Sequence, residues 1–144
     1  MKKIDAFWDS SALVPLCVDQ GGSAFARAAE RNKSIAVWWG TPLEMTGAFC
    51  RLLRSADMDR RGFEMAKNRL AAFRTRWVEV LPTERLRELG LSLMERHPLR
   101  AADAAQLAAA LVWSGEQARQ RPFICLDGRL AAAAAQEGFA VEIL

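Results

Sequence analysis

Residues 97–111 have the sequence HPLRAADAAQLAAAL. Alanine and leucine dominate it, so it predicts a helix that is buried on most sides. Asp103 lies just past the start of this helix, among small apolar neighbours. A carboxylate that enters a protein interior is costly unless it is paired, hydrogen-bonded or bound to a metal ion. Asp103 therefore needs a partner.

Short apolar segments alternate with helical patterns on both sides of this stretch. Strands are predicted at 4–9, 34–39, 77–82, 121–127 and 139–144. Further helices are predicted at 10–18, 21–32, 41–56, 59–76, 83–96 and 128–138. This alternation predicts one α/β domain over residues 1–144, in which a mostly parallel central sheet is flanked by helices on both faces.

Two prolines bear on where helices start. Thr41 is a good N-cap, Pro42 suits the first helical position, and Glu44 completes a capping box. Pro15 is tolerable in the 10–18 helix if it lies in or near the first turn.

Composition excludes several classes of protein. The chain has 144 residues and 51% hydrophobic content, which suits one compact globular domain. No apolar run reaches the roughly 18 residues that span a bilayer. Asp5 and Asp9 interrupt the one segment that resembles a signal peptide, so we expect the mature N-terminus of a cytoplasmic protein that does not bind membranes.

Cysteine and histidine, the side chains that bind zinc in most proteins, are scarce in this chain. Cys17, Cys50 and Cys125 are widely spaced in apolar surroundings, which favours reduced thiols over disulfides. His97 is the single histidine, and the cysteine spacing forms no zinc motif.

Four acidic residues fall where predicted strands lead into helices. Asp9 ends the first strand, Glu44 lies in the first turn after the second strand, Asp103 lies in the first turn of its own helix, and Asp127 ends the 121–127 strand. Sites in parallel sheets form beyond the carboxyl ends of the strands. Each acid alone is better explained as a cap, a turn residue or a favourable charge at a helix N-terminus. Taken jointly, they favour an acidic metal-binding cluster.

The chemistry of such a cluster follows from its donors. Carboxylates and water suit hard ions such as Mg²⁺ or Mn²⁺. One such ion, or two about 3.5–4 Å apart, activates a water and stabilises a leaving oxygen in phosphodiester hydrolysis. Without a cation, acids that share a pocket raise one another's pKa. A bound metal ion is therefore one explanation of Asp103.

The net charge of +3 is small, but arginine is concentrated in residues 51–76. This segment is interpreted either as a phosphate-binding surface or as a solvated helix face. The candidates for contact with RNA phosphates are Arg51, Arg54, Arg60, Arg61 and Arg69.

At the acidic residues the sequence resembles a PIN domain, and in particular the VapC-type toxin ribonucleases of bacterial toxin–antitoxin pairs. The resemblance rests on DSSALV (9–14), TPLEMTGAFCRLL (41–53), HPLRAADAAQLAAAL (97–111) and FICLDGRLAAAAAQEGF (123–139). These segments follow the order and approximate spacing of the family, and together with the alternating pattern of strands and helices the resemblance covers nearly the whole chain.

The resemblance implies an endoribonuclease that depends on Mg²⁺ or Mn²⁺ and cleaves structured RNA at few sites. It makes Asp9, Glu44, Asp103 and Asp127 the catalytic, metal-binding set, with Asp127 in contact with metal directly or through water. Ser10 and Ser11 match the hydroxyl residues that orient a carboxylate or water.

The resemblance also implies partners: a homodimer and a cognate antitoxin, both held by the 41–76 hairpin. One position departs from the family. Many relatives carry Thr or Ser two positions before the fourth acid, where this chain has Cys125.

The sequence leaves three alternatives to a ribonuclease function. A catalytically silent PIN-like scaffold that binds RNA or protein is the main alternative, although it has no use for four acids. A phospho-receiver domain needs a lysine at a late strand end, and the last lysine here is Lys67. An aspartate-based phosphatase needs a second acid two residues after Asp9, where the chain has Ser11.

Overall fold

Five strands form one sheet in the computed structural model, which describes residues 4–19, 21–22, 27 and 32–143. The strand order is β3-β2-β1-β4-β5, and every neighbouring pair is parallel. The strands are β1 (Ile4–Trp8), β2 (Asn32–Trp38), β3 (Val78–Val80), β4 (Pro122–Cys125) and β5 (Ala140–Ile143). The predicted α/β class and parallel sheet are confirmed.

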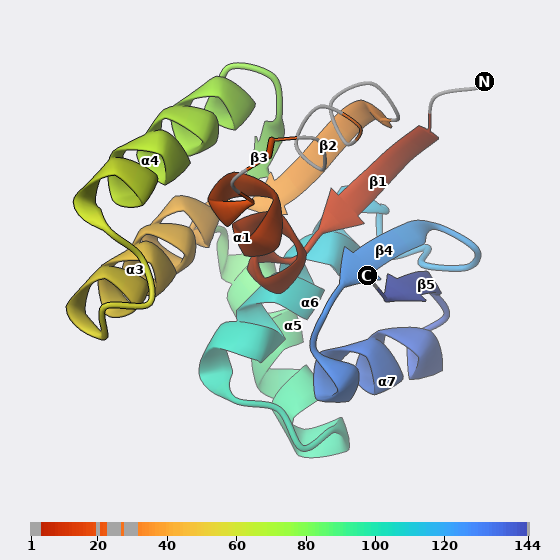
Figure 1. Ribbon diagram of the computed structural model, residues 1–144. Helices are drawn as coiled ribbons and strands as arrows, with labels where there is room; N and C mark the ends of the chain where they lie inside the picture. The colour runs from red at the N-terminus through yellow and green to blue at the C-terminus, as the bar shows by residue number, and fades with distance from the viewer. Residues whose placement is uncertain (1–3, 20, 23–26, 28–31, 144) are drawn as a thin grey trace.

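Helices connect the strands and cover both faces of the sheet (Figure 1). Those of the described residues are α1 (Ser10–Val18), α3 (Thr41–Arg54), α4 (Arg60–Arg74), α5 (Glu84–Arg96), α6 (Ala101–Trp113) and α7 (Gly128–Gln136). The helix predicted at 21–32 lies mostly outside the described residues. No helix of the described part is long and apolar enough to cross a membrane.

Alternating side chains of the buried strands separate the core into two clusters. Ala6 and Trp8 of β1 pack against α1, α3 and α4. Phe7, which lies between them in the sequence, points to the other face of the sheet and packs with side chains of α6 and β4. The same period of two continues in β4, where Ile124 joins the first cluster and Phe123 the second. The sheet is thus apolar on both faces, as expected of a buried parallel sheet.

The predicted start of α3 is wrong in its detail. Gly40 is the N-cap, no side chain caps the helix, and Thr41 is the first helical residue. Thr41 is fully buried, and its hydroxyl accepts a hydrogen bond from Gln106 Nε2 of α6 (3.1 Å). A contact with a helix distant in sequence therefore replaces the predicted capping box. Pro42 is the second helical residue rather than the first, one position later than predicted but still in the first turn.

Pro15 also lies elsewhere than predicted, because it is inside α1 rather than in its first turn. The helix continues past it to Val18, and the Asp19 N–H donates to the Pro15 carbonyl (3.1 Å). The three cysteines are free thiols, as expected.

Candidate active site

Asp9 follows the central strand β1 and is held in the interior. Its N–H donates to the Ile124 carbonyl (2.9 Å), and its side chain is the N-cap of α1. Carboxylate oxygen Oδ2 accepts from the Ser11 N–H (3.2 Å) and from the Ser11 hydroxyl. Asp9 is only 4% exposed, and this burial raises its pKa, with a further increase from the negative charge of Asp103.

Glu44 reaches the same region from the first turn of α3. Ser10 Oγ donates to Glu44 Oε1 (2.9 Å), and Gln106 Nε2 donates to Glu44 Oε2 (3.2 Å). Burial raises the pKa of Glu44, and the charges of Asp9 and Asp103 raise it further. Ser10 and Ser11 thus donate hydrogen bonds to two different carboxylates.

Gln106 is a residue of this site that the sequence interpretation missed. It is 1% exposed, and its amide nitrogen links α6 to both Thr41 and Glu44 of α3. Its Oε1 has no hydrogen-bond partner among the described residues. The available signal was one amide side chain in an otherwise apolar helix, three residues after Asp103 and so on the same face.

Asp103 lies in the first turn of α6, as predicted, but it is half-buried rather than enclosed on most sides. The buried part of α6 begins with Ala104. The Arg100 N–H donates to the Asp103 side chain, which is the ordinary role of a first-turn acid. Partial burial and the charge of Asp127 raise the pKa of Asp103, and the guanidinium groups of Arg100 and Arg129 oppose this rise.

Asp127 is exposed and caps α7. Its Oδ1 accepts from the N–H groups of Arg129 (2.8 Å) and Leu130 (3.2 Å). Cys125, at the position that departs from the family, donates its thiol hydrogen to the Asp127 carbonyl (3.7 Å). Burial together with the charges of Asp9 and Asp127 raises the pKa of Cys125 to about 12, so this thiol stays protonated at neutral pH.

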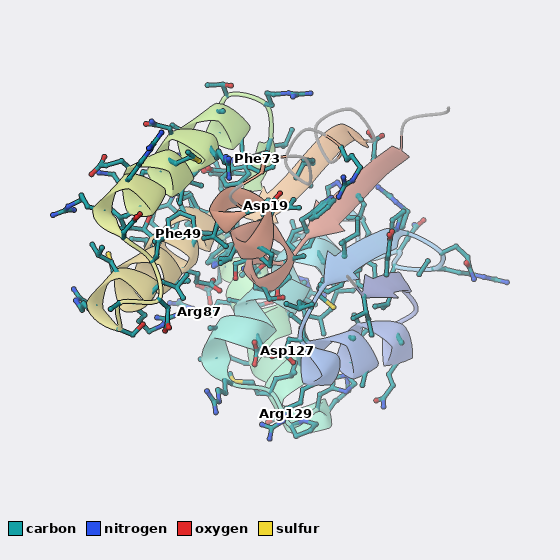
Figure 2. All side chains as sticks on the ribbon, in the orientation of Figure 1. Asp19, Phe49, Phe73, Arg87, Asp127 and Arg129 are labelled. Atoms are coloured by element: carbon teal, nitrogen blue, oxygen red, sulfur yellow. The ribbon has the colours of Figure 1, made fainter. Side chains whose placement is uncertain are left out.

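A pocket of about 660 Å³ opens where α6 and α7 begin. Its lining residues are Arg100, Ala102, Asp103, Asp127, Gly128 and Arg129. Figure 2 shows Asp127 and Arg129 on the same side of the molecule. The pocket therefore contains two acids and two arginines, and neither arginine was among the sequence-based candidates.

The four acids come together at one edge without closing around a common point. Within the described ranges, no three side chains of His, Cys, Asp or Glu are close enough to hold one metal ion. The acids do lie within electrostatic range of one another, as their raised pKa values show. An all-carboxylate donor set suits Mg²⁺ or Mn²⁺, and a cation relieves the repulsion. The donor chemistry fits such an ion.

The basic residues of 51–76 lie apart from these acids. Arg54 follows Glu44 by ten positions on the same helix, which corresponds to about 15 Å along its axis. Figure 1 shows α3 and α4 projecting from one flank, well away from α7. Arg69 donates from its guanidinium to the carbonyls of Cys17 (2.9 Å) and Asp19, so it links α4 to the end of α1. Arg60 lies 3.9 Å from Glu64 on its own helix.

Comparison with known protein-family profiles finds no match, and comparison with curated protein sequences finds none either. Solved structures do resemble the chain. One is a toxin–antitoxin complex from Klebsiella pneumoniae, with a TM-score of 0.62 and 16% identity over 88% of this chain and 90% of that chain. Another is VapBC2 from Rickettsia felis bound to a DNA fragment from its promoter, with a TM-score of 0.66 and 10% identity over 97% and 98%. The chain thus has a VapC-like PIN fold.

Proposed function

We propose that this chain is a metal-dependent endoribonuclease, the toxin of a toxin–antitoxin pair, which hydrolyses phosphodiester bonds in selected RNA. The observation that carries the proposal is the meeting of Asp9, Glu44, Asp103 and Asp127 at one edge of the sheet, where burial, and after it repulsion between the acids, raises the pKa of the first three. Four separate elements supply these acids, so the capping of individual helices does not explain why all four lie at the same edge of the sheet. The shared fold with toxin–antitoxin complexes supports the proposal.

In this proposal each residue has a definite role. Asp9, Glu44 and Asp103 would hold Mg²⁺ or Mn²⁺, with Asp127 in contact with the ion directly or through water. The ion, when bound, supplies positive charge and Lewis-acid polarisation beside the scissile phosphate. Ser11 fixes the Asp9 carboxylate. Ser10 and Gln106 fix one oxygen each of Glu44, which leaves that carboxylate little freedom to rotate.

A catalytically silent scaffold remains the second candidate, and one observation favours it. No three acids of the described residues share an ion-sized space, and Asp9 and Asp127 each use one oxygen to cap a helix. A scaffold of this kind would bind RNA or protein without any response to divalent ions.

Metal binding and cleavage separate the two functions. Mn²⁺ titration by calorimetry, together with RNA cleavage, would be measured for the wild type, for Asp103→Asn and for Asp57→Asn, a control in the exposed α3–α4 turn. The nuclease requires binding and discrete RNA cuts in the wild type and the control, and their loss in Asp103→Asn. A folded wild type that neither binds Mn²⁺ nor cuts RNA would establish the scaffold. Mapping new RNA 5′ ends after induced expression in a bacterial host would identify the target class.

We further propose a homodimer and an antitoxin partner that contact the α3–α4 hairpin. The relatedness of the fold to toxin–antitoxin complexes supports an antitoxin. Light scattering on the purified chain tests the dimer, since a dimer has twice the mass of the chain. Co-expression with the product of an adjacent small gene tests the antitoxin through relief of growth arrest.

A further inference from the structure

We infer that Arg100 and Arg129 form a phosphate-binding pair that holds the RNA backbone across the pocket beside Asp103 and Asp127. This inference rests on the proposed function and specifies how its substrate is gripped. It replaces the arginine-rich segment 51–76 as the principal contact with RNA.

The two arginines reach one pocket from different parts of the chain. Arg100 is the N-cap residue of α6, and Arg129 lies in the first turn of α7. Both are exposed, and both line the pocket of about 660 Å³ that also contains the two acids. A strand of RNA bound at the acids would therefore pass between two guanidinium groups.

The charge of these arginines is not consumed by ion pairs. Among the described residues, no carboxylate lies within ion-pair distance of either guanidinium. Arg85, Arg87 and Arg96 by contrast contact glutamates, whereas the exposed Arg51, Arg54 and Arg61 are, like Arg100 and Arg129, in no ion pair of the described residues. An unpaired guanidinium offers its planar set of donors to the two oxygens of a phosphate.

A phosphate at this edge also needs positive charge close by. Carboxylates repel a phosphodiester, and the carboxylates of Asp103 and Asp127 both line this pocket. Arg100 and Arg129 line the same pocket and bring positive charge beside these acids. They are therefore placed to offset the repulsion between the acids and an incoming phosphate.

The competing contact surface is less suited to this task. Arg69 is committed to backbone carbonyls of Cys17 and Asp19, and Arg60 lies near Glu64. Arg51 and Arg54 are exposed, but they lie at the far end of α3 from Glu44. They nevertheless make a matched control, because two exposed arginines are changed in each case.

The test measures RNA binding without cleavage. A fluorescein-labelled single-stranded RNA of mixed sequence, about 20 nucleotides long and so longer than a typical single-strand site, is titrated in EDTA and followed by anisotropy. Arg100→Gln/Arg129→Gln is compared with Arg51→Gln/Arg54→Gln and the wild type between about 50 and 200 mM salt. Thermal unfolding confirms that all three proteins are folded.

We expect the Arg100→Gln/Arg129→Gln protein to bind at least about tenfold more weakly, with a salt slope smaller by about 1.4 because two phosphate contacts are lost. The Arg51→Gln/Arg54→Gln protein should stay within about twofold of the wild type. Equal losses in both variants, a larger loss in Arg51→Gln/Arg54→Gln, or no binding by the wild type would each overturn the inference.

Cleavage with Mn²⁺ is measured on the same three proteins, so that the inference and the proposed function fail separately. A wild type that binds RNA through Arg100 and Arg129 but does not cut it would refute the nuclease and keep the phosphate site. A wild type that cuts RNA while the Arg100→Gln/Arg129→Gln protein binds normally would keep the nuclease and refute the phosphate site.

Discussion

Asp103 is the residue at which charge and structure are most easily separated. Asparagine at this position keeps an oxygen that accepts from the Arg100 N–H, so α6 should still begin at the same place. It removes the negative charge that repels Asp9, Glu44 and Asp127. We expect Asp103→Asn to lower the rate of RNA cleavage by at least about 100-fold, since even substitutions behind metal ligands cost about 10–100-fold.

The melting temperature of metal-free Asp103→Asn should equal or exceed that of the wild type, because burial and the charge of Asp127 both disfavour the ionised side chain. Asp57→Asn serves as the control for both measurements. Retention of cleavage by Asp103→Asn would remove this residue from the candidate site.

Asp127 has two roles that different substitutions distinguish. Its Oδ1 caps α7, and its charge contributes to the acidic edge. We expect Asp127→Ala to lower the free energy of unfolding by about 1 kcal/mol through loss of the cap, whereas Asp127→Asn, an equally good cap, changes it by less than about 0.5 kcal/mol. Both should lower cleavage. Urea unfolding and RNA cleavage of the two variants test this, and an Asp127→Asn protein with full activity would leave Asp127 as a cap alone.

The sequence predicts where these acids lie, but it does not predict which side chains donate hydrogen bonds to them. Strand ends and helix starts can be estimated from local patterns, and the parallel arrangement then brings their acids to one edge. The hydrogen bonds of Gln106 to Thr41 and Glu44 join residues more than 60 positions apart, and no local pattern contains them. Arg100 and Arg129 lie three residues before Asp103 and two after Asp127, but the sequence does not show that they line one pocket. The capping-box pattern predicts Thr41 as a cap because it contains only local residues, and it carries no information about burial against another helix.

At the scale of elements, Arg69 explains how α4 is attached to α1. Its guanidinium is partly buried and donates to two carbonyls at the C-terminal end of α1, where a positive charge is favourable. We expect Arg69→Gln to lower the free energy of unfolding by about 1.5–3 kcal/mol, the range for hydrogen bonds to charged groups. Urea unfolding would measure this, with exposed Arg54→Gln as the control. A stable Arg69→Gln protein that binds RNA weakly would instead restore Arg69 as an RNA contact.

The ends of α5 and α7 are joined by a charged cluster. His97 Nε2 donates to Glu137 Oε2 (2.7 Å), and the Arg96 guanidinium lies 3.0 Å from Glu137 Oε1. Burial alone raises the pKa of Glu137, but the hydrogen bonds from His97 and Arg96 outweigh burial and lower it below its ordinary 4.5. The cluster thus favours the ionised carboxylate of Glu137 in the folded state.

This lowered pKa has a predictable effect on stability. A carboxyl group whose pKa is lower in the folded state stabilises the fold above its unfolded pKa of 4.5, and this stabilisation is lost as the pH falls through the folded pKa. We expect Glu137→Gln to be less stable than the wild type by about 1–3 kcal/mol at neutral pH, with a difference that closes as the pH falls below 4.5 and through the lower pKa of the folded state. Urea unfolding at several pH values measures this. A difference that is constant with pH would exclude the ionised carboxylate as its source.

The elements themselves were predictable wherever their periodicity was strong. All five predicted strands and the helices of the described residues are present, because apolar runs and helix-start residues are local signals. The exact limits were less predictable. The 77–82 segment forms only the three-residue strand β3, since it pairs with β2 alone at one side of the sheet. Pro15 lies inside α1, where packing of the buried Leu13 and Leu16 outweighs the missing N–H.

At the scale of the whole molecule, the candidate site depends on both layers of the fold. Glu44 is on α3, which packs on one face of the sheet, whereas Asp103 and Asp127 begin α6 and α7 on the other face. Asp9 ends the central strand between them. The acidic edge therefore exists only while both core clusters are folded. The proposed function thus requires that the two clusters fold cooperatively.

Matched substitutions in the two clusters test that cooperativity. Leu13 belongs to the cluster under α1 and Leu107 to the cluster under α6, and both are completely buried. We expect Leu13→Ala and Leu107→Ala each to lower the free energy of unfolding by about 2–5 kcal/mol. Because β1 and β4 carry side chains into both clusters, each variant should unfold in one transition that is the same by circular dichroism and tryptophan fluorescence. Two separate transitions in either variant would show that one layer, with its share of the acids, folds without the other.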